Sequence, residues 1–304
     1  MNILQKLDNQ KVIQPPKWLL NNICYSTYMG SVIYGVSSDL SDCDIYGFCI
    51  PPKEEVFPHL RGEISGFGRQ IKRFEQYQQS HIKFNDRVYD INIYNIVKFF
   101  NLCMENNPNM IDCLFVPLNC IVSSTQVGNL VRENRKIFLH KGCWHKFKGY
   151  SYAQLNKLNS KEPIGKRKET IDKYGWDTKF GYHVARLLDE CEQILLFGDL
   201  DLQRSKEYLK AIRRGEVSKE SLIQWFQDKE KQLEKIYHES QTIPYSPDEE
   251  KIKALLFQCL EIHYGNIDNC VKKEQIKETD IIEALEKAIE IIRNKSERNM
   301  ETNS

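Results

Sequence analysis

The hydrophobic pattern of the chain changes its period near residue 125, and this change limits the possible folds more than any other feature. Before it, short apolar runs at Ile23–Met29, Asp44–Ile50 and Val88–Tyr94 predict three strands. From Gln126 onward the apolar residues recur with helical spacing. The sequence therefore predicts an α+β fold, with a mixed sheet and flanking helices followed by an all-helical C-terminal domain.

The length of 304 residues allows one large domain or two ordinary ones. We place the first domain at residues 1–138 and the helical domain at 139–295, with a polar, disordered tail at 296–304. Residues 53–85 carry no pattern that assigns them an element. Cap residues and helical spacing predict helices at 95–103, 126–138, 150–158, 176–197, 203–213, 219–238, 246–261 and 279–293.

Composition favours a cytoplasmic globular protein with no membrane partner. Charged residues make up 28% of the chain and aromatic residues 11%, which is typical of a folded domain rather than a disordered one. No apolar run in the sequence approaches the roughly 18 residues that span a bilayer. The ten cysteines include no C-x-x-C pair, which favours reduced, buried thiols.

Charge is unevenly distributed along the chain. The formal net charge is only +1, but residues 132–179 hold 13 Lys and Arg against 5 Asp and Glu. A basic stretch of this kind suits an anionic partner such as a nucleotide or a nucleic acid. A solvated surface without a ligand explains it equally well.

The segment from Tyr28 to Gly47 holds the residues with the clearest chemistry. One apolar strand ends at Gly30-Ser31, and after a polar loop the next begins with Asp42 and Asp44. Glycine permits a sharp turn and the close approach of a phosphate, and serine adds donors at a helix start. Residues two apart on a strand share a face, so the carboxylates repel each other unless a cation lies between them. Mg²⁺ prefers such oxygen ligands, and a polar turn without a ligand is the alternative.

This segment resembles the signature of the DNA polymerase β-like nucleotidyltransferase superfamily, carried here by Met29, Gly30, Ser31, Asp42 and Asp44. The string GSVIYGVSSDLSDCDIYG is similar to one branch in particular, the predicted nucleotidyltransferases of the RNA repair pathway DNA polymerase β family of bacteria and phages. Residues 90–117 and 174–198 share the resemblance, which extends over residues 23–260. It implies a polymerase β-like catalytic domain.

The superfamily resemblance also implies a third carboxylate on a neighbouring strand. Asp90 is our candidate, because alternation along Val88–Tyr94 places Asp90 on the same face as Val88 and Asn92. Asp86 is its nearest rival. The resemblance then implies that Asp42, Asp44 and Asp90 hold two Mg²⁺ ions. These would grip a triphosphate and activate an acceptor hydroxyl for in-line attack on the α-phosphorus.

The helix expected at Trp176–Phe197 carries the remaining site candidates. Lys179, His183, Arg186 and Glu190 fall on one helical face, and the branch resemblance places this helix across the cleft from the acids. We therefore predict Lys179 and Arg186, and also His183, as contacts to the triphosphate or the acceptor phosphate. A solvated polar stripe is the alternative.

Taken together, the resemblance implies a Mg²⁺-dependent nucleotidyltransferase that moves a nucleoside monophosphate from an NTP, ATP in our reading, to a hydroxyl acceptor. Gly30 and Ser31 would cradle the β and γ phosphates. An RNA 3′ end is the acceptor that the branch favours. The alternatives are a protein side chain or small molecule as acceptor, and a catalytically idle module that binds nucleotide or nucleic acid. The residues identify no protein partner.

Overall fold

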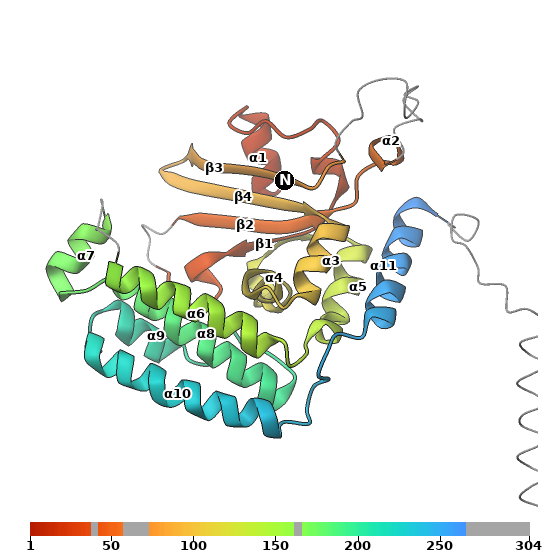
Figure 1. Cartoon of the computed structure of the whole chain (residues 1–304). Coiled ribbons are helices and arrows are strands. Elements are labelled where there is room, and N and C mark those ends of the chain that lie inside the picture. Colours follow the sequence, from red (N-terminus) through yellow and green to blue (C-terminus); the bar gives the residue numbers. More distant parts are fainter. Residues whose placement is uncertain (38–41, 57–72, 161–165, 266–304) are drawn as a thin grey trace, which may run out of the picture. The chain divides into compact units, whose positions relative to one another are not determined.

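A mixed sheet of five strands organises the first half of the described chain (Figure 1). The computed structural model describes residues 1–37, 42–56, 73–160 and 166–265. Its strands β1 (Ile23–Met29), β2 (Cys43–Cys49), β3 (Gln76–Phe84), β4 (Arg87–Asn95) and β5 (Ile121–Ser124) lie in the order β3-β4-β2-β1-β5. β2 and β4 are parallel, and the other neighbours are antiparallel.

The sequence predicts β1, β2 and β4 but misses the two edge strands. β3 lies in the stretch to which we assigned no element, because Gln78, Ser80, His81 and Lys83 are all exposed and leave little apolar alternation to detect. β5 has only four residues, all half-buried, and follows directly on the segment where strands were expected to end. Edge strands bury less apolar surface, so their sequence signal is weak.

The two faces of the sheet pack against different cores. On one face, side chains such as Ile45, Ile91 and Ile93 meet Leu4 and Leu7 of α1 (Ile3–Asn9). The other face contributes Tyr25 and Phe48 to a larger core that also includes α3 (Ile96–Met104), α4 (Pro108–Phe115) and α5 (Gln126–Glu133). Alternation places Asp44 and Asp90 on the Phe48 face, since side chains on a strand point to opposite faces in turn.

The second half of the described chain is helical, as predicted. Its helices are α6 (Cys143–Ser160), α7 (Lys166–Tyr174), α8 (Thr178–Phe197), α9 (Lys206–Arg213) and α10 (Lys219–Glu239). One short helix, α2 (Lys53–Val56), belongs to the first half of the chain. α6, α9 and α10 all pack on α8, which is therefore buried on most sides. Asp177 caps the start of α8 by accepting from the backbone N–H of Lys179 and Phe180, and Gly198 ends it in the left-handed conformation.

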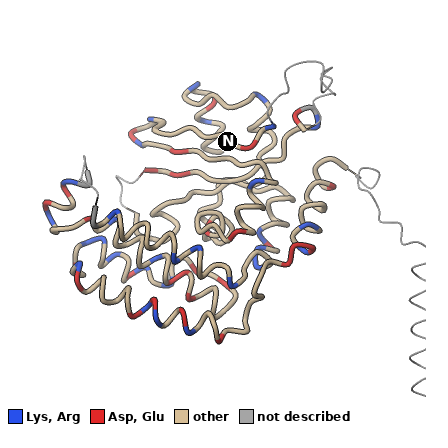
Figure 2. Tube along the Cα trace, viewed as in Figure 1, with Lys and Arg blue, Asp and Glu red and all other residues tan. Residues whose placement is uncertain are grey.

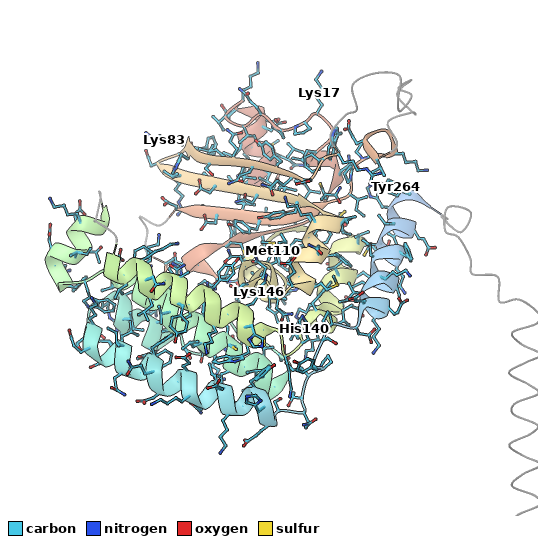
Figure 3. The ribbon with its side chains drawn as sticks, viewed as in Figure 1. Lys17, Lys83, Met110, His140, Lys146 and Tyr264 are labelled. Atoms are coloured by element: carbon cyan, nitrogen blue, oxygen red, sulfur yellow. The ribbon has the colours of Figure 1, made fainter. Side chains whose placement is uncertain are left out.

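The last described helix returns to the sheet part of the fold. α11 (Glu249–Tyr264) packs against α3 and α5, and Tyr264, labelled in Figure 3, donates a hydrogen bond to the Pro51 carbonyl. Its N-cap is Asp248, so the helix begins at Glu249 and not at the predicted residue 246. Residues Met1–Gly265 form one contact unit, so the division at residue 138 stays a prediction. The predicted helix 279–293 and tail 296–304 lie outside the described residues.

Some basic residues of the stretch 132–179 form ion pairs with acidic residues of other elements. Lys136 pairs with Asp199 at 2.6 Å, Lys146 with Glu105 at 3.0 Å and Lys148 with Glu230 at 2.7 Å. Figure 2 shows basic and acidic residues intermixed over the helices of the second half. Partners within the fold therefore explain part of the local charge excess without a ligand.

Two further expectations concern thiols and membranes. The nine cysteines in the described ranges are unpaired, and all are buried except the half-buried Cys43. None of the helices in these ranges has the length and apolar character needed to span a bilayer.

Candidate active site

A tight turn at the end of β1 brings the main chain against a carboxylate. Gly30 has a φ of +72°, and a Cβ built on it would lie 2.3 Å from Oδ2 of Asp44. Only glycine accepts both this backbone conformation and this contact. The chain then turns through Ser31 to Gly35, where the backbone N–H of Gly35 donates to the Val32 carbonyl at 3.1 Å. We call Gly30–Gly35 the glycine–serine turn.

Strand register places two of the predicted acids side by side. Asp44 and Asp90 are direct partners in the parallel pair of β2 and β4, and partners across a parallel pair point to the same face. Asp90 is held in place by an irregularity in β3, where the backbone N–H of His81 donates to Asp90 Oδ1 at 2.7 Å. The sheet thus presents two adjacent carboxylates beside the glycine–serine turn.

The electrostatics of Asp44 show how closely the negative charges gather. Burial raises its pKa from the ordinary value of 3.8 to about 6, and repulsion from Asp90 and Asp42 adds to the rise. The charge of Lys179 opposes this rise, so the start of α8 faces the same cluster. A half-buried carboxylate with two acidic neighbours is stabilised by a bound cation, and an all-oxygen donor set of this kind fits Mg²⁺.

Asp42 has a different status from the other two acids. It is exposed and directly follows residues 38–41, which lie outside the described ranges. Across the residues that the structure describes, no three His, Cys, Asp or Glu side chains are arranged closely enough to hold an ion as they stand. The structure brings Asp44 and Asp90 together, and a part for Asp42 as a third ligand stays a prediction.

The predicted stripe on α8 divides into two parts. Lys179 is exposed at the first turn of the helix, and His183, half-buried, lies beside Tyr182 with 4.5 Å between the ring centres. Arg186 and Glu190 are only 6% and 2% exposed, because α8 is the central helix of its group rather than a surface helix. The expected single polar face therefore ends after His183.

Arg186 is held by carboxylates of the protein itself. Its Nη1 donates to Asp112 Oδ2 of α4 and to Glu190 Oε1, the latter at 3.1 Å. Burial raises the pKa of both carboxyls, and the guanidinium opposes that rise. Because these carboxylates already engage the charge of Arg186, we do not propose Arg186 as a nucleotide contact. Lys179 and His183 remain our candidates for such contacts.

Two residues outside the predicted site also shape this region, and sequence reasoning missed the second of them, Asp112. Tyr34 closes the glycine–serine turn, and its hydroxyl donates to Asp112 Oδ2 at 2.6 Å. Asp112 is fully buried, and the signal that could have found it is a single acid within the apolar run Met110–Val116. A buried acid in such a helix requires a partner.

Comparisons with known proteins agree with this architecture. Residues 2–254 match the family described as RNA repair pathway DNA polymerase beta family. An uncharacterised 38.9 kDa protein from the nrdC-mobD intergenic region of Enterobacteria phage T4 is 26% identical over 137 residues. That match covers 44% of this chain and 38% of the phage protein, so less than half of that relative's length is matched.

A solved structure, the nucleotidyltransferase-like protein from Exiguobacterium sibiricum 255-15, aligns with 96% of this chain and 90% of its own. Its sequence identity is 8% and its TM-score 0.29.

The match to this family model defines the chain as polymerase β-like by class. More narrowly, the chain belongs to the RNA repair pathway DNA polymerase beta family, whose model covers most of its length.

Proposed function

We propose that the protein transfers a nucleoside monophosphate from an NTP, with ATP as the first candidate, to the 3′ hydroxyl of an RNA strand and releases pyrophosphate. The observation that carries this proposal is the contact between Gly30 and the carboxylate of Asp44, with Asp90 as its register partner. This arrangement sets a phosphate-binding turn directly against an acidic pair. A triphosphate and a divalent cation need these two features next to each other.

Each group has a defined part in the proposal. The backbone N–H groups of the glycine–serine turn and the Ser31 hydroxyl bind the β and γ phosphates. Asp44 and Asp90 hold Mg²⁺, with Asp42 as the third ligand of a two-ion site. When bound, the ions lower the pKa of the acceptor hydroxyl and stabilise negative charge on the transferred phosphate. Lys179 and His183 contact the triphosphate from α8.

The acceptor is the least constrained part of the proposal. The family description names RNA repair, and residues 132–179 carry an excess of basic residues, which together favour a polyanionic acceptor. A protein side chain or a small molecule would use the same donor site. The acceptor is therefore identified by where the label goes.

The test is an incubation with α-³²P-labelled NTPs, Mg²⁺ and candidate acceptors. We expect label on single-stranded RNA with a free 3′ hydroxyl and none on the same RNA ending in a 3′ phosphate. Label on the protein itself or on a small molecule would move the proposal to those acceptors. If no acceptor is labelled but the protein binds NTP, it is an idle binding module.

Substitution of the acids tests the site itself. Asp44→Asn or Asp90→Asn should lower the transfer rate about a thousandfold, because each removes a charge that binds the metal ions. Asp86→Asn is the matched control: this exposed residue of the same hairpin has a φ of +59°, which asparagine tolerates, and it should keep full activity. Wild-type rates in Asp44→Asn and Asp90→Asn would refute the assignment.

A further inference from the structure

A buried charge cluster lies directly behind the glycine–serine turn. It consists of Tyr34 from the turn, Asp112 from α4, and Arg186 and Glu190 from α8. The Tyr34 hydroxyl donates to Asp112 and accepts from Arg186, and the guanidinium also lies over the Tyr34 ring at 4.6 Å from its centre. One phenol therefore joins the turn to two helices.

A contribution to folding stability does not explain how the buried charges of this cluster are paired. All four residues are at most 6% exposed, yet Arg186 donates to Tyr34, Asp112 and Glu190 from the same guanidinium nitrogen, Nη1. Arg186 Nε and Asp112 Oδ1 have no hydrogen-bond partner among the described residues. Buried ion pairs often add little net stability compared with apolar residues of the same volume. The contacts instead determine where the Tyr34 hydroxyl lies.

The position of Tyr34 determines the position of the turn. The backbone N–H of Val36 donates to the Ser31 carbonyl at 3.1 Å. This hydrogen bond closes a short loop of backbone from Ser31 to Val36, and Tyr34 lies within that loop. A second tie comes from the helical part, where Gln203 Nε2 donates to the Ile33 carbonyl at 3.2 Å. The turn is thus fixed from outside the sheet, by residues on the side of α8.

The link from Tyr34 to Arg186 leads along α8 to Lys179, the cation that faces Asp44. Arg186 lies seven residues after Lys179, about two turns along the same helix. A continuous helix transmits position rigidly over this distance. Anchoring Tyr34 to Arg186 therefore fixes the glycine–serine turn relative to Lys179.

We propose that Arg186 and Asp112 are positioning residues which, through the Tyr34 hydroxyl, hold the glycine–serine turn at the spacing from Lys179 that an NTP requires. This inference rests on the proposed function, because it concerns the same nucleotide site. It assigns no direct substrate contact to the cluster. Its removal should weaken NTP binding and leave the acceptor's own contacts unchanged.

The test removes single atoms from the cluster in the full chain. Tyr34→Phe deletes only the hydroxyl, and Asp112→Asn keeps the shape of the side chain. We expect both to raise the KM for NTP about tenfold and to leave the KM for the acceptor within about twofold. Arg186→Lys keeps the charge but not the geometry, so it should share the NTP defect.

Glu192→Gln is the matched control on the same helix. Glu192 is also 6% exposed and pairs with Arg204 at 3.2 Å and with Lys229, and neither of these side chains is one of those that hold the turn. It should lower the melting temperature without raising the KM for NTP. An equal rise in that KM for Glu192→Gln, or none for Tyr34→Phe, would overturn the inference.

A second measurement separates this inference from the proposed function. Hydrogen exchange at the backbone N–H groups of residues 31–36 should be faster in Tyr34→Phe than in the wild type, with exchange along α10 unchanged. Wild-type protein that fails to transfer would end the proposed function, and faster exchange would still support the anchor. Unchanged exchange in the turn would overturn the anchor whatever the activity.

Discussion

At the scale of single residues, the site is dominated by the contact between Gly30 and Asp44. The carboxylate occupies the space that a side chain would take, which explains both the glycine and the half-buried position of the acid. Burial next to Asp90 makes ionisation of Asp44 unfavourable without a cation. The acids that we propose as metal ligands therefore destabilise the metal-free protein.

This cost predicts a pH-dependent stability difference. The folded-state pKa of Asp44, about 6, exceeds the ordinary value of 3.8, so the folded protein holds its proton more tightly. The wild type consequently loses this contribution to stability as the pH rises from about 4 to about 6. In EDTA, Asp44→Asn should be more stable than wild type by about 1 to 3 kcal/mol at pH 7.5 and equal to it below about pH 4.

Urea unfolding of wild type and Asp44→Asn across this pH range measures the difference. Asp86→Asn should follow the wild type at every pH. Addition of Mg²⁺ at pH 7.5 should stabilise wild type more than Asp44→Asn, since the ion offsets the repulsion. A difference that does not change with pH would show that Asp44 is not the source.

At the scale of elements, the sequence predicts the helices and strands that have a strong hydrophobic period. It misses the features that depend on how neighbouring elements pack. β1, β2 and β4 and the helices from α8 onward follow from apolar spacing and caps. The predicted polar stripe on α8 is only half right, because a helix surrounded by α6, α9 and α10 buries even its polar face. Spacing shows that Lys179 and Arg186 share a face, but it does not show that only Lys179 is exposed.

The edge strand β3 shows the same limit at the candidate site. Register alternation predicts the face of Asp90, but the donor that orients it is a backbone N–H of a strand that the sequence does not predict. His81 adopts a φ of +58° where the register of β3 shifts against β4. Such a bulge redirects a backbone donor out of the ladder.

Substitution at His81 separates backbone geometry from side-chain chemistry. His81→Gly keeps the N–H and favours positive φ, so the transfer rate should stay within about threefold of wild type. His81→Val disfavours this conformation by about 1 to 2 kcal/mol and should lower the transfer rate about tenfold. The reverse order, with glycine the more damaging change, would point to the imidazole. Steady-state kinetics with labelled NTP decides between them.

At the scale of the whole molecule, the chain order and the packing order differ at α11. This helix follows the helical part in sequence, but Ile252, Leu255 and Cys259 pack into the core shared with α3 and α5. It therefore supports the sheet part rather than the group around α8. Sequence periodicity detects the helix but does not say which core it joins.

This placement predicts the outcome of two truncations. A chain that ends at Gly265 retains the whole contact unit and should unfold at the temperature of the full chain. A chain that ends at Pro247 loses α11 and exposes three buried side chains, each worth about 1.5 to 3 kcal/mol. Its melting temperature should fall by about 10 °C or more.

Calorimetry of the three chains measures these shifts, and Leu255→Ala in the full chain checks their cause. That single change should cost about 2 to 5 kcal/mol, whereas Lys253→Ala, at an exposed position of the same helix, should be nearly neutral. If removal of α11 left the melting temperature unchanged, the sheet core would be complete without it. The boundary of the sheet part would then lie before residue 248.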